Sequence, residues 1–202
     1  KVVFAGDIVR GWDAVLLSDI AAYQNKTPET ATAAWSKEAI LAENGNLIVL
    51  SDGVGAMLGG ASAQEYAQSL GTLIAALKQD SSAGTVIVVT GLPYIKGQDA
   101  QLCAAYNAAI RAVALEHNVL YANLYRAQSQ TVWTLDAELN PSESGKLLAA
   151  GEVLQELLRT CSCLAVNATT ELKISATAPA EKTEAALEAF RAAADADAMR
   201  KA

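Results

Sequence analysis

Four short apolar runs constrain what this chain can fold into more than any other feature. They lie at residues 1–5 (KVVFA), 46–50 (NLIVL), 85–89 (TVIVV) and 119–122 (VLYA). The turn-forming sequences Gly-Asp, Ser-Asp-Gly and Gly-Leu-Pro follow the first three of them. Strands that are apolar on both faces are typical of a parallel sheet covered by helices on both sides. The runs therefore predict buried strands of such a sheet.

Segments with apolar residues at helical spacing alternate with these runs. The predicted helices cover residues 12–23, 27 to about 42, 62–77, 99–113 and 140–158. Thr27-Pro28 indicates a helix start, because Thr can cap and Pro suits the first helical position. Ser62 and Glu65 form a capping box. Alternating strands and helices predict a three-layer α/β/α fold with right-handed crossovers.

The helical spacing also predicts which side chains face the core. They are Val15, Leu16, Ile20, Tyr23, Trp35, Leu41, Tyr66, Leu70, Leu73, Ile74, Leu77, Leu102, Cys103, Tyr106, Ile110, Val113, Leu147, Leu148, Leu154, Leu157 and Leu158.

The residues from 161 onward break this alternation. Residues 170–176 (TELKISA) alternate polar and apolar side chains, as a half-exposed strand does. From about Pro179 onward the chain is charged and Ala-rich and predicts one long helix. We therefore expect an α/β domain over residues 1–160 and a C-terminal extension of a strand and a long helix over residues 161–202. Such a helix could lie along another protein, so the extension is the expected site of a protein partner.

Composition excludes several classes of protein. The chain is 52% hydrophobic, which excludes a disordered chain. Its 22 acidic residues against 15 basic ones disfavour nucleic acid as a partner, because phosphates would be repelled. No apolar stretch approaches the roughly 20 residues that span a bilayer. The first residue is Lys1 rather than Met, so we expect an upstream segment to have been removed or left out. The sequons at Asn25 and Asn167 are compatible with secretion.

Neither the cysteines nor a glycine motif indicates a cofactor. Cys103, Cys161 and Cys163 do not make a disulfide framework, and the last two lack the C-x-x-C spacing of redox or zinc sites. The G-x-G-x-x-G spacing of dinucleotide-binding proteins is absent after the first strand. We therefore expect no cofactor and interpret the cysteines as plain thiols.

Binding sites of open parallel sheets form at the carboxyl ends of the strands. Asp7, Asp52 and Asp136 are expected at this edge, where three carboxylates could hold a hard cation such as Mg²⁺ or Ca²⁺. The alternative reading of Ser51 and Asp52 is a turn with a helix-capping acid. The only histidine, His117, comes at the end of a helix just before a strand. That order places it at the opposite edge, as a structural or solvent-exposed residue.

The segments expected at the carboxyl edge resemble the sequence blocks of the SGNH (GDSL-type) hydrolases, in the family's order. Residues 2–12 (VVFAGDIVRGW) are similar to the first block, a strand that ends in Gly-Asp-Ser-Ile and then Gly-Trp. Residues 47–56 (LIVLSDGVGA) resemble the third block, a strand followed by Gly-x-Asn-Asp. Residues 106–121 are similar to the helix-to-strand passage of many members, and residues 136–145 (DAELNPSESG) resemble the last block, Asp-x-x-His then Pro-Ser-Glu-x-Gly. The resemblance implies a parallel, flavodoxin-like sheet and an ester hydrolase's site.

The chain departs from this family at the residues for which the family is named. The positions that match the family's site are Asp7, Ile8, Gly55, Asp136 and Asn140. Ile8 stands where the nucleophilic Ser is expected, Gly55 where the oxyanion-binding Asn is expected, and Asn140 (or Leu139) where the general-base His is expected. Asp136 alone matches its counterpart, the acid of the last block.

The family's second block is also missing from the resemblance. Its Gly has no clear counterpart near Lys26-Thr27. The stretch between the first predicted helix and Thr27 is too short for the family's second strand. The sequence therefore predicts a sheet without that strand.

These departures predict a protein without ordinary acyl-enzyme chemistry, which needs a hydroxyl, a base and donors for the oxyanion. The leading interpretation is a non-catalytic structural or interaction subunit, a pseudoenzyme. An active ester or acetyl-ester hydrolase and a carboxylate-lined module that binds a cation or another ligand are the alternatives. A pocket filled by side chains such as Ile8 and Met57 would favour the non-enzyme.

Overall fold

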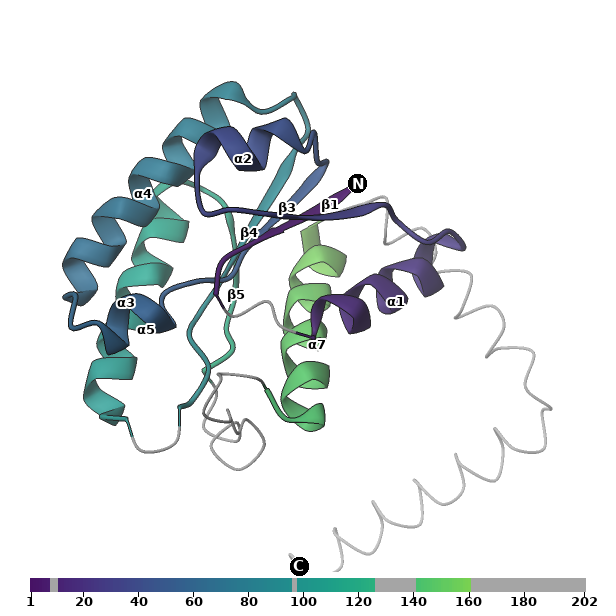
Figure 1. Ribbon diagram of the computed structural model, residues 1–202. Helices are drawn as coiled ribbons and strands as arrows, with labels where there is room; N and C mark the ends of the chain where they lie inside the picture. The colour runs from purple at the N-terminus through teal and green to yellow at the C-terminus, as the bar shows by residue number, and fades with distance from the viewer. Residues whose placement is uncertain (8–10, 96–97, 126–140, 161–202) are drawn as a thin grey trace, which may run out of the picture. The chain divides into compact units, whose positions relative to one another are not determined.

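The computed structural model of the chain describes residues 1–7, 11–95, 98–125 and 141–160 (Figure 1). In chain order its elements are β1 (Val2–Ala5), α1 (Asp13–Gln24), β2 (Thr30–Ala33), α2 (Lys37–Ala42), β3 (Leu47–Leu50), α3 (Val54–Leu58), α4 (Ala63–Asp80), β4 (Val86–Thr90), α5 (Ala100–Glu116), β5 (Leu120–Ala122) and α7 (Glu143–Thr160). The expected strand and helix of the C-terminal extension lie outside the described residues.

The strands form one parallel sheet in the order β2-β1-β3-β4-β5. This confirms the α/β fold class. The chain moves from β1 outward to β2 and then returns across β1 to β3, so the direction of winding reverses between β1 and β3. Loops diverge at such a switch point, which makes the carboxyl ends of β1 and β3 the natural place for a site.

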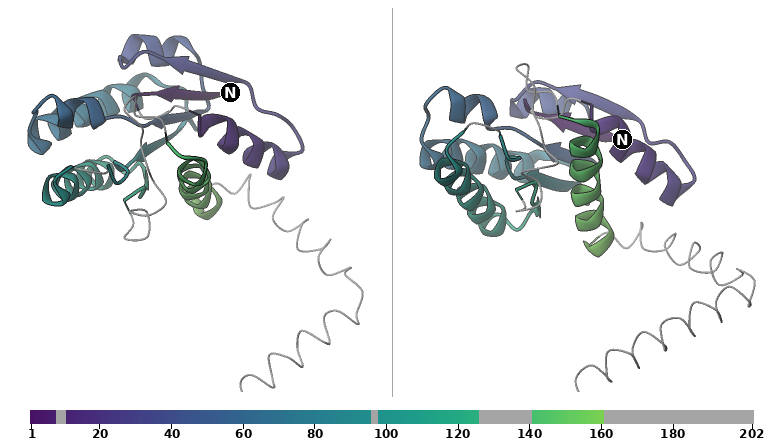
Figure 2. Two further views of the ribbon diagram at one scale, coloured as in Figure 1. Left: turned by 60° about the horizontal axis from the view of Figure 1, so that its bottom comes forward. Right: turned by 90° about the horizontal axis from the view of Figure 1, so that it is seen from below.

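Helices cover both faces of the sheet (Figure 2). Helix α1 packs against α7, whereas α4 packs against both α2 and α5. Right-handed crossovers explain this division, because the connection from β1 to β2 runs opposite to all later ones. All four residues of β1 are buried between the two layers, and β3 and β4 are buried almost throughout. The core that the apolar runs predict is therefore present.

The expected helix from Thr27 is wrong in its first half. Thr30–Ala33 forms β2, the edge strand that pairs with β1, and α2 begins only at Lys37. β-Branched Thr30 and Thr32 favour an extended chain, and their alternating exposure suits an edge strand. Ser36 provides the actual helix cap, since its Oγ accepts a hydrogen bond from the backbone N–H of Ala39 at 3.2 Å. The expectation that the second strand is missing is therefore also wrong.

The expected inward face of α7 is partly wrong as well. Leu147 is 64% exposed. The buried face instead carries Gly145, Ala149, Val153 and Leu157, one residue in every four. Other predicted core residues that are only half-buried are Val15, Tyr23, Trp35, Leu41, Leu73, Leu102, Leu148, Leu154 and Leu158.

The predicted capping box is confirmed, and a second long helix also begins with a side-chain cap. Ser62 and Glu65 make both hydrogen bonds of the capping box at the start of α4. Asp99 accepts a hydrogen bond from the N–H of Gln101 at 2.8 Å and so caps α5. In the part of the chain that the structure describes, no helix is long and apolar enough to span a membrane.

Candidate functional site

The carboxyl ends of β1 and β3 bring two of the expected site residues together. Ala5 pairs with Leu50 in the sheet, and the N–H of Ser51 donates to the carbonyl of Ala5 at 2.9 Å. Asp7 and Asp52 follow these strands directly. The backbone N–H of Asp7 donates to Oδ1 of Asp52 at 3.1 Å. The sequence-based expectation that these carboxylates share one edge is met by direct contact.

The side chain of Asp7 holds the segment after β3 in place. Its Oδ2 accepts a hydrogen bond from the N–H of Gly55 at 2.6 Å, in the first turn of α3. Gly55 is the position at which the family resemblance expects the oxyanion-binding Asn. Here its backbone N–H is already engaged by Asp7. The other carboxylate oxygen of Asp7, Oδ1, is buried and has no hydrogen-bond partner among the described residues.

Asp52 titrates unusually because of this environment. Burial, and after it the negative charge of Asp7, raise the pKa of its carboxyl group to about 6. The N–H of Asp7 and the hydroxyl of Tyr66 oppose the rise, because both stabilise the ionised form. Burial and the neighbouring charge of Asp52 raise the pKa of Tyr66 far above its usual range.

Tyr66 is the site residue that the sequence did not predict. Its position in the periodic pattern of α4 marked it as a core residue, and it is indeed 7% exposed. The pattern gave no sign that its hydroxyl would reach Asp52. The ring lies beside Tyr106 of α5, with centroids 5.6 Å apart. A Cβ at Gly53 would lie 2.9 Å from the ring, so the turn after β3 lies directly against Tyr66.

Ser51 is not available as a nucleophile at this edge. It is completely buried, and its Oγ lies 2.7 Å from Oγ1 of Thr90, at the end of the adjacent strand β4. The two hydroxyls hydrogen-bond to each other across the sheet. Ser51 therefore stabilises the turn after β3, which agrees with the reading of Ser51 and Asp52 as turn residues.

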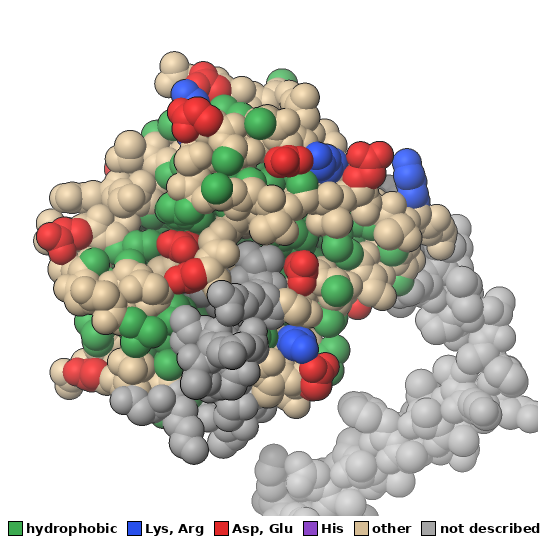
Figure 3. All heavy atoms as spheres, viewed as in Figure 1, with side chains coloured by type: hydrophobic (Ala, Val, Ile, Leu, Met, Phe, Trp, Pro, Cys, Tyr) green, Lys and Arg blue, Asp and Glu red, His purple; other side chains and the backbone are tan. Residues whose placement is uncertain are grey.

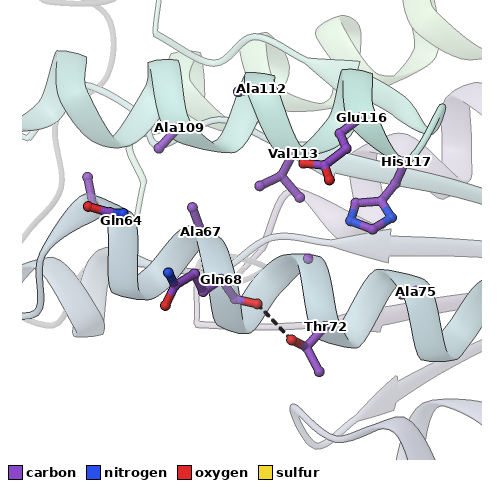
Figure 4. Close-up of a pocket in the computed structure, with 12 residues that line it drawn as sticks. Gln64, Ala67, Gln68, Thr72, Ala75, Ala109, Ala112, Val113, Glu116 and His117 are labelled. Atoms are coloured by element: carbon purple, nitrogen blue, oxygen red, sulfur yellow. Dashed lines mark hydrogen bonds between the residues drawn. The ribbon is translucent and has the colours of Figure 1, made fainter.

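His117 lies at the opposite edge of the sheet. It caps the C-terminal end of α5 immediately before β5, so it stands at the amino ends of the strands. Figure 4 shows its ring in the open groove between α4 and α5, where it lies over Gly71. Its backbone carbonyl accepts a hydrogen bond from Nζ of Lys78. The prediction that His117 is remote from the carboxyl edge is confirmed.

The groove of Figure 4 is formed by small side chains on both helices. Its volume is about 790 Å³. The small residues that line it are Ala63, Ala67, Gly71, Ala75, Ala109 and Ala112. Among the labelled side chains, Gln64 and Gln68 come from α4 and Glu116 from the end of α5 (Figure 4). This groove lies on the outer face of the helix layer and contains neither Asp7 nor Asp52.

The loop after β4 is tied to α5 by a buried amide. Nδ2 of Asn107 donates to the carbonyl of Leu92 at 3.2 Å, and Oδ1 accepts from the hydroxyl of Tyr121 at 3.4 Å. Nearby, Met57 is 3% exposed and contacts Cys103, with Sδ and Sγ 3.8 Å apart. Met57 therefore belongs to the core beneath α3. Burial raises the pKa of the Cys103 thiol, which fits a plain thiol.

Several expected site residues lie outside the described residues. They are Ile8, Asp136, Asn140, Cys161 and Cys163. Of the three carboxylates that were expected to form a cluster, the structure therefore describes only Asp7 and Asp52. Within residues 1–7, 11–95, 98–125 and 141–160, no group of three His, Cys, Asp or Glu side chains is placed to hold a metal ion.

Comparison with solved structures identifies the fold. A lipase/acylhydrolase from Enterococcus faecalis matches with a TM-score of 0.64 at 17% identity, over 78% of this chain and 94% of that one. A member of the lipolytic G-D-S-L family from Veillonella parvula matches with a TM-score of 0.55 at 17% identity, over 76% and 95% of the two chains. The chain has the SGNH-type fold. No model of a protein family and no curated protein sequence matches it.

A third neighbour in fold is an acetylxylan esterase. The acetylxylan esterase Axe2 from Geobacillus stearothermophilus has a TM-score of 0.63 at 16% identity, over 77% of this chain and 92% of that one. Structures of Axe2 described as catalytic mutants carry alanine in place of a serine, an aspartate or a histidine. The likeness to the present chain is one of fold.

Proposed function

We propose that this protein is a pseudoenzyme with the SGNH-type fold, a non-catalytic structural or interaction subunit. The observation that carries the proposal is the position of its histidine. The chain contains one histidine, and His117 lies at the amino edge of the sheet, away from Asp7 and Asp52. An imidazole base for a serine nucleophile is therefore lacking at the carboxyl edge. Loss of one member of a catalytic triad commonly costs about 10⁴-fold or more in rate.

The other parts of an acyl-transfer site are also altered. Ile8 follows Gly6-Asp7 in the sequence, so the position resembling the family's nucleophile has no hydroxyl. The buried hydroxyl of Ser51 is hydrogen-bonded to the hydroxyl of Thr90. The N–H of Gly55 donates its hydrogen bond to Asp7. Neither this hydroxyl nor this backbone N–H is therefore free to act on a substrate.

A protein partner is the second part of the proposal. Residues 161–202 form an extension of the sequence beyond the segment that resembles the SGNH hydrolases, and we propose that this extension binds the partner. Nucleic acid is disfavoured as that partner by the net charge of −7. On the face shown in Figure 3, acidic and basic side chains are scattered among uncharged ones rather than gathered into one patch.

A fluorophosphonate probe tests the loss of catalysis. The full chain is incubated with the probe beside an active serine esterase as the positive control, and adducts are located by mass spectrometry. We expect labelling of the esterase and none of this chain above its heat-denatured sample. A stoichiometric adduct on one serine of the native chain would overturn the proposal.

A truncation after Thr160 tests the partner. We expect the full chain to form a larger assembly with its native partner in sedimentation experiments, and the truncated chain to lose it. A cooperative thermal melt of the truncated chain serves as the control for folding. An assembly that survives truncation would contradict a role for the extension.

An active ester hydrolase is the second candidate function. The observation that favours it is the identity of the fold neighbours, which are named as an acylhydrolase and as acetylxylan esterases. With its pKa near 6, Asp52 would be the available base in such an enzyme. Ester turnover measured beside the probe experiment separates the two candidates, because a carboxylate that activates a bound water would hydrolyse an ester without forming a serine adduct.

A further inference from the structure

One carboxylate oxygen of Asp7 is buried without a hydrogen-bond donor among the described residues. Oδ2 of this carboxylate is hydrogen-bonded to the N–H of Gly55, but Oδ1 is shielded from solvent and has no partner among the described residues. A buried carboxylate oxygen without a donor costs free energy, so such atoms normally have one. A donor for Oδ1 is therefore expected close by.

Asp52 is the neighbour that can supply this donor. Its Oδ1 accepts the N–H of Asp7 at 3.1 Å, which holds the two carboxyl groups against each other at the ends of adjacent strands. The negative charge of Asp7 acts directly on Asp52. Two ionised carboxylates that adjoin in this way would repel strongly in a partly desolvated site. One proton shared between them removes the repulsion and satisfies the orphaned oxygen.

We propose that Asp52 carries a proton and donates it to Oδ1 of Asp7, so that the two residues form a pH-sensitive latch between the segments that follow β1 and β3. The latch joins three elements, because Asp7 also holds the first turn of α3 through Gly55. It lies at the switch point of the sheet, where the loops of this fold diverge. The proposal does not depend on whether the protein is an enzyme.

The groups that face Asp52 agree with this assignment. Asp7 faces it from the end of β1 and Tyr66 from α4, and Tyr66 is flanked in turn by Tyr106 of α5. Among the described residues, no Lys, Arg or His acts on Asp52. Burial and the charge of Asp7 together raise its pKa to about 6, whereas the Asp7 N–H and the Tyr66 hydroxyl only limit the rise. The proton therefore resides on Asp52 under mildly acidic conditions.

Loss of this proton opens the latch as the pH increases. Above pH about 6 Asp52 is ionised, and Oδ1 of Asp7 loses its donor. The two carboxylates then repel each other, which pushes the segments after β1 and β3 apart and weakens the hydrogen bond from the Gly55 N–H to Asp7. A compartment below this pH keeps the carboxyl edge closed, and a neutral compartment loosens it.

Side-chain ¹³C NMR of the full-length protein tests the assignment. Asp carboxyl carbons are followed from pH 3 to 8, and Asp99→Asn is the matched control, because Asp99 is an exposed carboxylate whose capping role Asn can keep. We expect one Asp carbon, assigned to Asp52, to titrate with a midpoint near 6 and to move the amide signal of Gly55 with the same midpoint. The control should leave both midpoints unchanged.

Asp52→Asn provides the second readout. The amide of Asn can donate to Oδ1 of Asp7 without titrating, so the Gly55 amide signal should become independent of pH between 4 and 8. An Asp52 midpoint below about 5 in the wild type would overturn the proposal, and this result does not require any variant to fold. Calorimetry with Mg²⁺ and Ca²⁺ is the other decisive measurement. Binding of either ion that Asp52→Asn abolishes would show that a cation, not a proton, joins the pair.

Discussion

Gly6 and Ser51 are in such close contact that a larger residue does not fit at position 6. A Cβ atom on Gly6 would lie 2.0 Å from the carbonyl oxygen of Ser51. The backbone of Gly6 has φ of +121°, a conformation that L side chains rarely adopt. The loops after β1 and β3 thus approach each other through their backbones. This contact is what brings the N–H of Asp7 within reach of Asp52.

Substitution of Gly6 by Ala is therefore expected to destabilise the fold strongly. Overpacking against a backbone atom and the positive φ together should cost about 3 kcal/mol or more of unfolding free energy. Gly84→Ala is the control, because Gly84 also has a positive φ, +88°, but its Cβ would meet open space. That change should cost about 1 kcal/mol. Urea unfolding measures both, and equal losses would contradict the role of the close contact.

The Ser51–Thr90 pair is expected to behave as a structural hydrogen bond. Ser51→Ala and Thr90→Val should each cost about 1–2 kcal/mol, because each leaves the other hydroxyl buried without a partner. The double variant should lose less than the sum of the two single losses. A double-mutant cycle in urea measures the coupling. Strict additivity would show that the two hydroxyls do not depend on each other.

The capping box at the start of α4 gives a local test of the fold. Ser62→Ala removes the Oγ that accepts from the N–H of Glu65 at 3.1 Å, and should cost about 1 kcal/mol. Ser69→Ala is the matched control, since Ser69 is exposed in the middle of the same helix. There alanine should be neutral or slightly stabilising because of its helix propensity. Thermal unfolding compares the two, and a loss at Ser69 as large as that at Ser62 would argue against the cap.

The stability of the protein should depend on pH through Asp52. Its folded pKa of about 6 lies above the ordinary value of 3.8, so its contribution to stability is complete below pH about 4 and is lost as the pH rises through 6. For a fully shielded group this shift corresponds to about 3 kcal/mol, but solvent screening at this partly exposed carboxyl reduces the expected loss to on the order of 1 kcal/mol. Unfolding at pH 4 and pH 7 measures it.

Asp52→Asn should remove this dependence between pH 4 and 7, because Asn carries no titrating proton. Asp99→Asn should leave the wild-type difference between the two pH values intact. If the variant Asp52→Asn lost stability with pH as steeply as the wild type does, another group would be responsible.

Much of the sheet could be predicted because buried parallel strands are recognisable in the sequence as short apolar runs. Runs of this kind occur at β1, β3, β4 and β5. The edge strand β2 was missed because one side of it is open, so its sequence, TATA, contains no large apolar residue. Its partner β1 supplies the pairing, and this information is absent from the local sequence.

The site could be predicted in part for the same reason. Strand order along the chain placed Asp7 and Asp52 at one edge, and His117 at the other, without any knowledge of side-chain packing. The roles of Tyr66 and of the Gly55 N–H depend on distances between loops, which the sequence does not encode locally. Leu147 shows the same limit, since the buried face of α7 is set by how closely α1 approaches rather than by the largest side chains.

Steady-state hydrolysis of a short acyl ester by the full-length protein decides whether this SGNH-type fold has lost catalysis. We predict a rate no higher than that of a non-enzymatic protein at equal concentration, unchanged in the variant His117→Gln. Saturable turnover well above this background that is abolished by a single substitution at the carboxyl edge, such as Asp52→Ala, would contradict it.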